Sequence, residues 1–244
     1  MSYVDDSNPY RTWGMVAAQA DTNERASFIR QTYAHLLGAV LAFAGIEAVL
    51  LTTPLAEQLT GLLLGNGRLG WLIVLGAFVG VSYLANSWAS SATSVKTQYL
   101  GLGLYVVAEA IIFAPLLYIA QLYEGPGGNI LANAVMLTAL IFGGLTAIVF
   151  MTGADFSFLR SALLVGGIAA FGIIICSAIF GFSLGIVFIA AMLVFASGYI
   201  LYDTSNVLHH YRIGQHVAAS LALFASVALL LWYVVQLLMS LNRR

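Results

Sequence analysis

Seven apolar stretches, each long enough to cross a lipid bilayer, follow one another along the chain. A bilayer core of about 30 Å needs roughly 20 consecutive apolar residues in a helix. Only 8% of the residues are charged, whereas an average soluble domain has about 25%. The sequence therefore predicts an all-α integral membrane protein, with spans at about 31–53, 69–90, 99–122, 130–152, 159–180, 185–207 and 217–240.

Short turn sequences separate the spans: TTP before residue 55, GNGR at 65–68, EGPGGN at 124–129, TGADF at 152–156 and GFSLG at 181–185. Glycine and proline at these points are typical of helix ends. Because the connections are short, we expect consecutive helices to be antiparallel neighbours. No segment outside the spans is long enough to fold alone. We therefore expect a polar N-terminal tail, residues 1–30, followed by a single transmembrane domain, residues 31–244.

The basic residues favour one orientation. With the N-terminus inside, the inner flanks of the spans carry six Lys and Arg and the outer flanks carry three, which agrees with the positive-inside rule. The N-terminus and the tail are then predicted to be cytoplasmic. The inner set is Arg11, Arg25, Arg30, Lys96, Arg160 and Arg212, and the outer set is Arg68, Arg243 and Arg244.

Several classes of function are excluded by composition. A net charge of −1 provides no basic surface for nucleic acid. Cys176 is the only cysteine, and no Cys/His spacing indicates a zinc site. Lys96, the only lysine, lies in a loop, which excludes a retinal Schiff base in the last span. Three of the four histidines share one loop, which favours a solvated, pH-responsive loop over haem ligation. Since no nucleophile–base pair stands out, we expect neither an enzyme nor a resident cofactor.

Three carboxyl groups lie inside the predicted spans: Glu47, Glu109 and Asp203. Each costs about 2.5–3.5 kcal/mol at a helix centre, so each is expected to face protein or water. No Lys or Arg inside a span can pair with them, so they must be protonated, hydrogen-bonded or occupied by a cation. Helix rise places Glu109 near the midplane, Asp203 near the inner surface and Glu47 in the outer half. The three predict a line of proton or cation sites across the membrane. A structural role for Asp203 or Glu47 remains the alternative.

Small residues indicate where helices approach each other closely. Gly76 and Gly80 form such a surface in the second span, and Ala196–Ser197–Gly198 forms another in the sixth. We expect tight helix packing at both surfaces.

Three longer motifs are more specific: FIRQTYAHLLGAVLAFAGIEAVL at 28–50, TGADFSFLRSAL at 152–163 and SGYILYDTSNVLHHY at 197–211. In sequence, order and spacing they resemble the Bax inhibitor-1 family and, within it, the bacterial YccA-like branch. The resemblance covers the chain from about residue 25 to 240. It implies a bundle of six helices around a central seventh. For some members it implies a pH-sensitive calcium leak, and for the YccA-like branch it implies restraint of the membrane protease FtsH.

In the leak mechanism that the resemblance implies, an aspartate of the sixth span shares a proton with an aspartate of the seventh. Asp203 matches the first through LYDT. The second position falls in LFASVAL, where Ser226 replaces the aspartate and Leu229 replaces a nearby asparagine. A serine can hydrogen-bond to Asp203 but cannot share its titration. Glu109 lies at about the same estimated depth as Ser226. Our hypothesis is therefore that Glu109 supplies the missing carboxyl group.

Three interpretations follow. In the first, the protein is a pH-sensitive leak for calcium or protons, with Asp203, Glu109, Glu47 and Ser226 along the pathway and Asp203 as a calcium ligand. In the second, it modulates FtsH by direct binding through its polar tail, without ion transport. In the third, it is a structural membrane protein. In each, Asp203 is expected to join the last two spans by a hydrogen bond to Ser226, Tyr202 or Asn206, and the location is expected to be a bacterial inner membrane.

Overall fold

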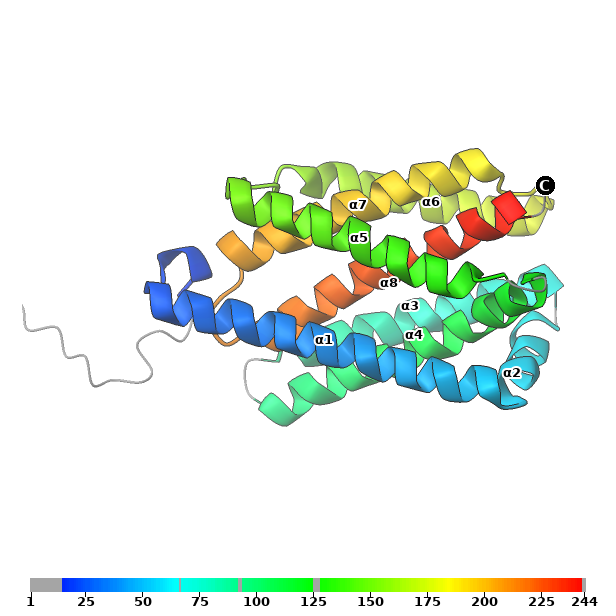
Figure 1. Ribbon diagram of the computed structural model, residues 1–244, viewed down its shortest axis with the longest axis horizontal. Helices are drawn as coiled ribbons and strands as arrows, with labels where there is room; N and C mark the ends of the chain where they lie inside the picture. The colour runs from blue at the N-terminus through cyan, green and yellow to red at the C-terminus, as the bar shows by residue number, and fades with distance from the viewer. Residues whose placement is uncertain (1–14, 66, 92–93, 125–127, 243–244) are drawn as a thin grey trace, which may run out of the picture.

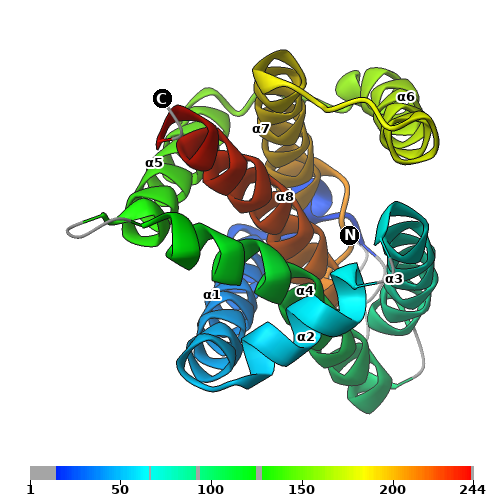
Figure 2. The ribbon, with the colours of Figure 1, turned by 90° about the vertical axis from the view of Figure 1, so that its right-hand side faces the viewer.

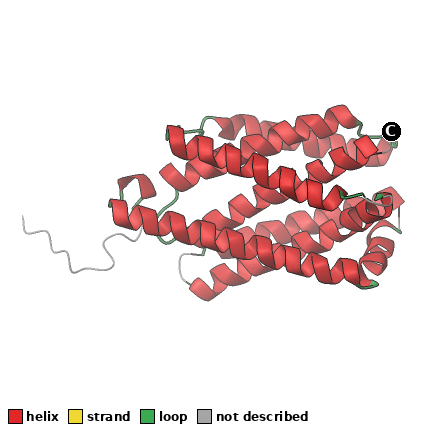
Figure 3. Cartoon of the chain, viewed as in Figure 1, coloured by secondary structure: helices red, strands yellow, loops and turns green. Residues whose placement is uncertain are grey.

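The structure, a computed structural model, describes residues 15–65, 67–91, 94–124 and 128–242. Apart from one isolated β-bridge, all regular structure in these ranges is helical (Figures 1 and 3). Seven of the described helices are long and apolar enough to cross a membrane, so the chain is an all-α, multi-pass membrane protein, as predicted. The elements are η1 (Ala17–Gln19), α1 (Thr22–Thr52), α2 (Leu55–Leu64), α3 (Gly67–Ala89), α4 (Val95–Tyr123), α5 (Ile130–Thr152), α6 (Leu159–Phe180), α7 (Ile186–His209) and α8 (His216–Asn242).

Two helical segments differ from the sequence-based prediction. Helix α1 begins at Thr22 rather than near residue 31, and α2 was not predicted as a helix. Both differences have the same cause, because apolar length was the criterion for a span. The first turns of α1 are polar, and the ten residues of α2 reach only about 15 Å, too short to cross a bilayer. The boundary between a tail and a membrane domain at residue 30 stays a prediction.

The predicted turn sequences do end helices. Gly153 follows α5 with φ 61°, and Gly181 follows α6 with φ 81°, both in the left-handed region that glycine enters without a Cβ clash. Their backbone N–H groups bond to the carbonyl oxygens of Val149 and Ser177, each at 2.9 Å. The glycines therefore close the last helical turns of α5 and α6.

Helix α8, the seventh of the long helices, lies in the middle of the bundle (Figure 2). It packs against α1, α3, α4, α5 and α7, as expected for a central last span. Aromatic rings join it to its neighbours: Phe224 lies 5.9 Å from Phe43 of α1, and Trp232 lies 5.0 Å from Phe113 of α4, between ring centroids. Helix α4 is as central as α8, since 61% of its most apolar stretch is buried.

Of the two small-residue surfaces, the one at Gly198 does meet a neighbouring helix, since a Cβ built there would lie 3.2 Å from Cδ2 of Leu163 in α6. The one at Gly76 and Gly80 does not. Among the described residues, nothing lies within 4 Å of a Cβ built on Gly76 or Gly80. A Cβ on Gly101 of α4 would instead stand 2.5 Å from the backbone nitrogen of Ala89 and 2.6 Å from the carbonyl oxygen of Ala85. The prediction for Gly76 and Gly80 was wrong because glycine in a lipid-facing position looks the same in sequence as glycine in a contact.

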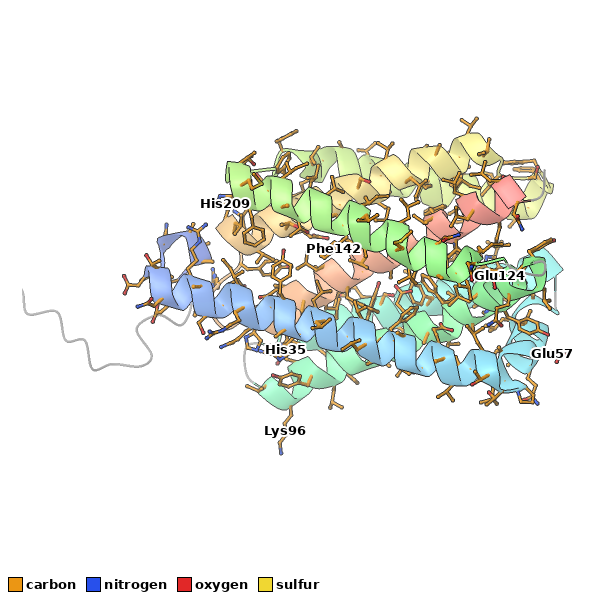
Figure 4. All side chains as sticks on the ribbon, in the orientation of Figure 1. His35, Glu57, Lys96, Glu124, Phe142 and His209 are labelled. Carbon is orange, nitrogen blue, oxygen red and sulfur yellow. The ribbon has the colours of Figure 1, made fainter. Side chains whose placement is uncertain are left out.

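Charged side chains gather at the two ends of the bundle. We call the end where α1, α4 and α8 begin the N-terminal end, and the opposite one the C-terminal end. Figure 4 shows Lys96 at the N-terminal end, and Glu57 and Glu124 at the C-terminal end. This arrangement makes a buried carboxyl group between the two ends exceptional.

Candidate functional site

A cavity of about 610 Å³ lies among α3, α4, α6, α7 and α8. Most of its lining is aromatic or aliphatic. Two carboxyl groups reach it, Glu109 from α4 and Asp203 from α7, and the hydroxyl-bearing Ser226 reaches it from α8. Glu109 is 6% exposed and Asp203 is 8% exposed. The structure thus brings three of the four predicted pathway residues to one cavity.

Asp203 and Ser226 hold α7 and α8 together. The Ser226 hydroxyl donates a hydrogen bond to Oδ2 of Asp203, and the same hydroxyl lies 3.2 Å from the carbonyl oxygen of Ala222. Of the three partners considered from the sequence for Asp203, Ser226 is therefore the one bonded to it. The serine that replaces the family aspartate still contacts the aspartate of α7.

Glu109 lies within one helical turn of the level of this pair. On α4, Tyr105 packs against Phe224 of α8, and Phe113 packs against Trp232 of α8. Glu109 stands midway between the two α4 residues, so it is level with Ala228, midway between the two α8 residues. Its own hydrogen-bond partner is Tyr105, one turn earlier on α4. The arrangement is compatible with Glu109 as the second carboxyl group, although its bond runs to Tyr105 and not to Asp203.

Glu47 lies apart from the cavity. It is on the face of α1 that also carries Phe43, is 4% exposed, and is not among the cavity-lining residues. Neither of its carboxyl oxygens has a hydrogen-bond partner within the described ranges. The line of three carboxyl groups across the membrane is therefore divided between two places in the bundle. A pathway role for Glu47 stays a prediction.

A polar network at the N-terminal end joins two of the sequence motifs. Ser205 of α7 accepts a hydrogen bond from the backbone N–H of Phe156 at 2.8 Å, and its hydroxyl donates to Asp155 at 3.3 Å. Nε2 of His210 lies 3.2 Å from the Asp155 carboxylate. The backbone N–H of Ser157 and then the contact with His210 lower the pKa of Asp155 from 3.8 to about 2. This network was missed, although TGADF and LYDTSN contain three of its members.

The start of the described chain closes over the same end. The backbone N–H of Ala17 bonds to the carbonyl oxygen of Tyr211 at 2.8 Å, and the N–H of Ile213 bonds to that of Met15 at 3.0 Å. Residues 15–17 therefore pair with the loop between α7 and α8. Burial raises the pKa of Tyr211 in this loop.

His216 is less solvated than predicted, whereas His210 is exposed. His216 is the first residue of α8, and its ring centroid lies 4.9 Å from that of His35 in α1. His35 also contacts the Tyr99 hydroxyl through Nε2 at 2.8 Å.

Fewer than three His, Cys, Asp or Glu side chains meet at any one point of the described ranges, so calcium would need oxygens from other residues or water.

Comparison with known proteins identifies a family. The profile described as inhibitor of apoptosis-promoting Bax1 matches residues 25–243. An uncharacterised protein of Pseudomonas aeruginosa is 28% identical over 86% of this chain and 88% of its own length. A protein of Escherichia coli K12 named modulator of FtsH protease YccA is 27% identical, over 82% of this chain and 83% of its own. A protein of another Escherichia coli strain, named inner membrane protein YccA, matches to the same extent. No solved structure gives a significant match.

Proposed function

The chain belongs to the Bax inhibitor-1 family, and we propose that it forms a pH-sensitive leak for cations, calcium among them, through its helix bundle. One observation carries this proposal: the buried hydrogen bond between Asp203 and Ser226 lies at a cavity that also holds Glu109. Among the residues that the structure describes, none that lines the cavity is a Lys or Arg. The charge at the site therefore changes only when a carboxyl group gains or loses a proton, or when a cation enters.

Protonation of Asp203 changes how this residue can hydrogen-bond to α8. A protonated Asp203 can be both donor and acceptor toward α8, whereas an ionised Asp203 is an acceptor only. Ionisation also places a negative charge in the cavity, which attracts a cation and repels an ionised Glu109. We propose that Asp203 is then a ligand of the passing calcium ion, with Ser226 and Glu109 as further oxygen donors. Calcium takes six to eight oxygens, so water has to supply the remainder.

Calcium flux in proteoliposomes tests the proposal. We expect flux through the wild type to differ between about pH 6 and about pH 8, because the charge at the cavity changes when a carboxyl group there gains or loses a proton. The Asp203→Asn variant is expected to lose that dependence. Glu57→Gln, which removes an exposed carboxyl group from α2, is the matched control and should behave as the wild type. Flux no greater than in empty liposomes at both pH values would overturn the leak.

A second function is supported by a different observation. The Escherichia coli relative is named a modulator of FtsH protease. We propose that this protein also binds an FtsH-type protease, with the N-terminal tail as the contact. The pairing of residues 15–17 with the α7–α8 loop supports this, because it holds the start of the described chain at one end of the bundle. The name of the second Escherichia coli relative, inner membrane protein YccA, and the basic residues of this chain support an inner-membrane location with that end in the cytoplasm.

Deletion of residues 2–14 separates the two functions. The deletion spares Met15 and Ala17, so the contacts with the α7–α8 loop are kept. A leak is expected to survive it, whereas co-purification with FtsH is expected to be lost. Retained co-purification would exclude the deleted segment as the contact. A longer deletion, to residue 25, would remove the first turn of α1 and confuse the two effects.

A further inference from the structure

We propose that the cavity is a binding site for an arylalkyl monoamine, with the ammonium group at Glu109 and Asp203 and the aromatic ring against the walls. The site goes beyond the leak and does not depend on it, because binding requires no passage across the bundle.

The charge of the site favours a cation that remains bound. Glu109 and Asp203 are both more than nine-tenths buried and both line the cavity. Their hydrogen-bond partners in the described structure are hydroxyl groups, those of Tyr105 and Ser226. A buried carboxylate without a cationic partner is costly, and an ammonium group provides both the opposite charge and hydrogen-bond donors.

The remaining walls favour an organic cation over a bare metal ion. Trp71 and Trp232 stack at 6.4 Å between ring centroids with an interplanar angle of 13°, and Phe113 meets Trp232 edge-on at 5.0 Å. All three line the cavity. Aromatic faces attract ammonium groups and pack against an aromatic ligand, but they offer no oxygen to calcium. A volume of about 610 Å³ is in the range of small-molecule sites.

Helix α6 supplies the outer wall and a route of entry. Gly167, Ala170 and Phe171 of α6 line the cavity, as do Trp71 and Phe78 of the neighbouring α3. In Figure 2, α6 stands at the edge of the bundle, beyond α7 and α3. Only 11% of its most apolar stretch is buried, so separation of α6 from α3 disturbs few contacts. A ligand dissolved in the membrane can therefore reach the carboxyl groups from the side.

Three ligands of equal size test the charge requirement on the wild type. We would titrate purified full-length protein in detergent micelles with phenylbutylamine, phenylbutanol and phenylbutyrate, using calorimetry with empty micelles as the blank. We expect one amine per chain, and at least about tenfold weaker binding of the alcohol and the carboxylate, because a hydrogen bond to a charged group is lost. Equal affinity for the amine and the alcohol would overturn the proposal and indicate partition into an apolar space.

Matched variants test the location. Glu109→Gln is expected to weaken amine binding at least about tenfold, whereas Glu47→Gln, which removes a buried carboxyl group outside the cavity, is expected to leave it unchanged. Unchanged affinity in Glu109→Gln, or an equal loss in Glu47→Gln, would overturn the site. If Glu109→Gln does not fold, the comparison of the three ligands on the wild type still tests whether the cavity binds the amine through its charge. Because no ion gradient is used, failure of the leak leaves this result unaffected.

Discussion

Helices α4 and α6 are both long and apolar, yet the protein uses them in opposite ways. The most apolar stretch of α4 is 61% buried and that of α6 is 11% buried. At Gly101, α4 meets the backbone of α3, whereas at Gly166 and Gly167, α6 meets the side chains of Phe195 and Tyr199. The cavity lies between the tightly packed α4 and the sparsely packed α6, and Glu109 lines it from α4. The contrast indicates that α4 and α8 provide stability, while α6 provides a wall that can move.

The largest effect is expected at the junction of α3 and α4. Gly101→Ala places a methyl group 2.5 and 2.6 Å from backbone atoms, which cannot move without moving α3. We expect a loss of about 3 kcal/mol, the upper end for overpacking, seen as a lower unfolding temperature in detergent. Gly76→Ala in α3 is the control, since its Cβ has open space, and should leave stability unchanged. Equal stability of the two variants would show that α4 is not packed rigidly against α3.

A smaller effect is expected on the α6 side. In Gly166→Ala the new methyl group lies 2.8 Å from Cε2 of Phe195, a ring that can turn or move with its helix. We expect a loss of about 1 kcal/mol and a displaced α6. A spin label on Cys176, the exposed and only cysteine, would report greater mobility of α6. Gly172→Ala, with nothing within 4 Å of its Cβ in the described part of the chain, is the control. A loss as large as that of Gly101→Ala would mean that α6 is as rigidly held as α4.

The sequence predicts the spans well and their contacts poorly. Hydropathy locates seven helices, and Gly153 and Gly181 mark where two of them end, because both signals are local. Contacts depend on how each helix is rotated. Helix α4 is apolar on every side, so no stripe identifies the face that Gly101 presents to α3. Ser226 was one of three partners considered for Asp203, because a family motif supplied that pairing. The similar depth of Glu109 and Ser226 could be counted along the helices, but the cavity that Glu109 shares with Asp203 could not be predicted.

Ser205 tests the connection between the two motifs at the N-terminal end. Ser205→Ala removes the acceptor of the Phe156 N–H and the donor to Asp155. We expect a loss of about 1 kcal/mol, typical of a hydrogen bond of this kind. Hydrogen exchange in the α5–α6 loop should accelerate, since this loop leads directly into α6. Ser197→Ala is the control, because within the described part of the chain that hydroxyl bonds only inside α7, to the carbonyl oxygen of Leu193. Unchanged exchange would show that α6 is held without the network.

The smallest effect is expected at Asp155, which is exposed. Its pKa is lowered from 3.8 to about 2, so the folded state favours the ionised form. The stabilisation is therefore complete above about pH 4 and is lost as the pH falls through about 2. Because the side chain is 45% exposed, we expect less than about 1 kcal/mol. The difference in unfolding temperature between the wild type and Asp155→Asn should shrink from about pH 5 to about pH 2.

His210→Ala separates the two causes of that shift. The backbone N–H of Ser157 is the larger cause and His210 the smaller, so the variant should keep most of the pH dependence. Complete loss of the dependence in His210→Ala would make the link between α7 and the α5–α6 loop an ion pair, and acid would then release the N-terminal end of α6. Retention of the dependence means that Asp155 mainly stabilises its own loop, and that the freedom of α6 comes from its sparse packing along the membrane.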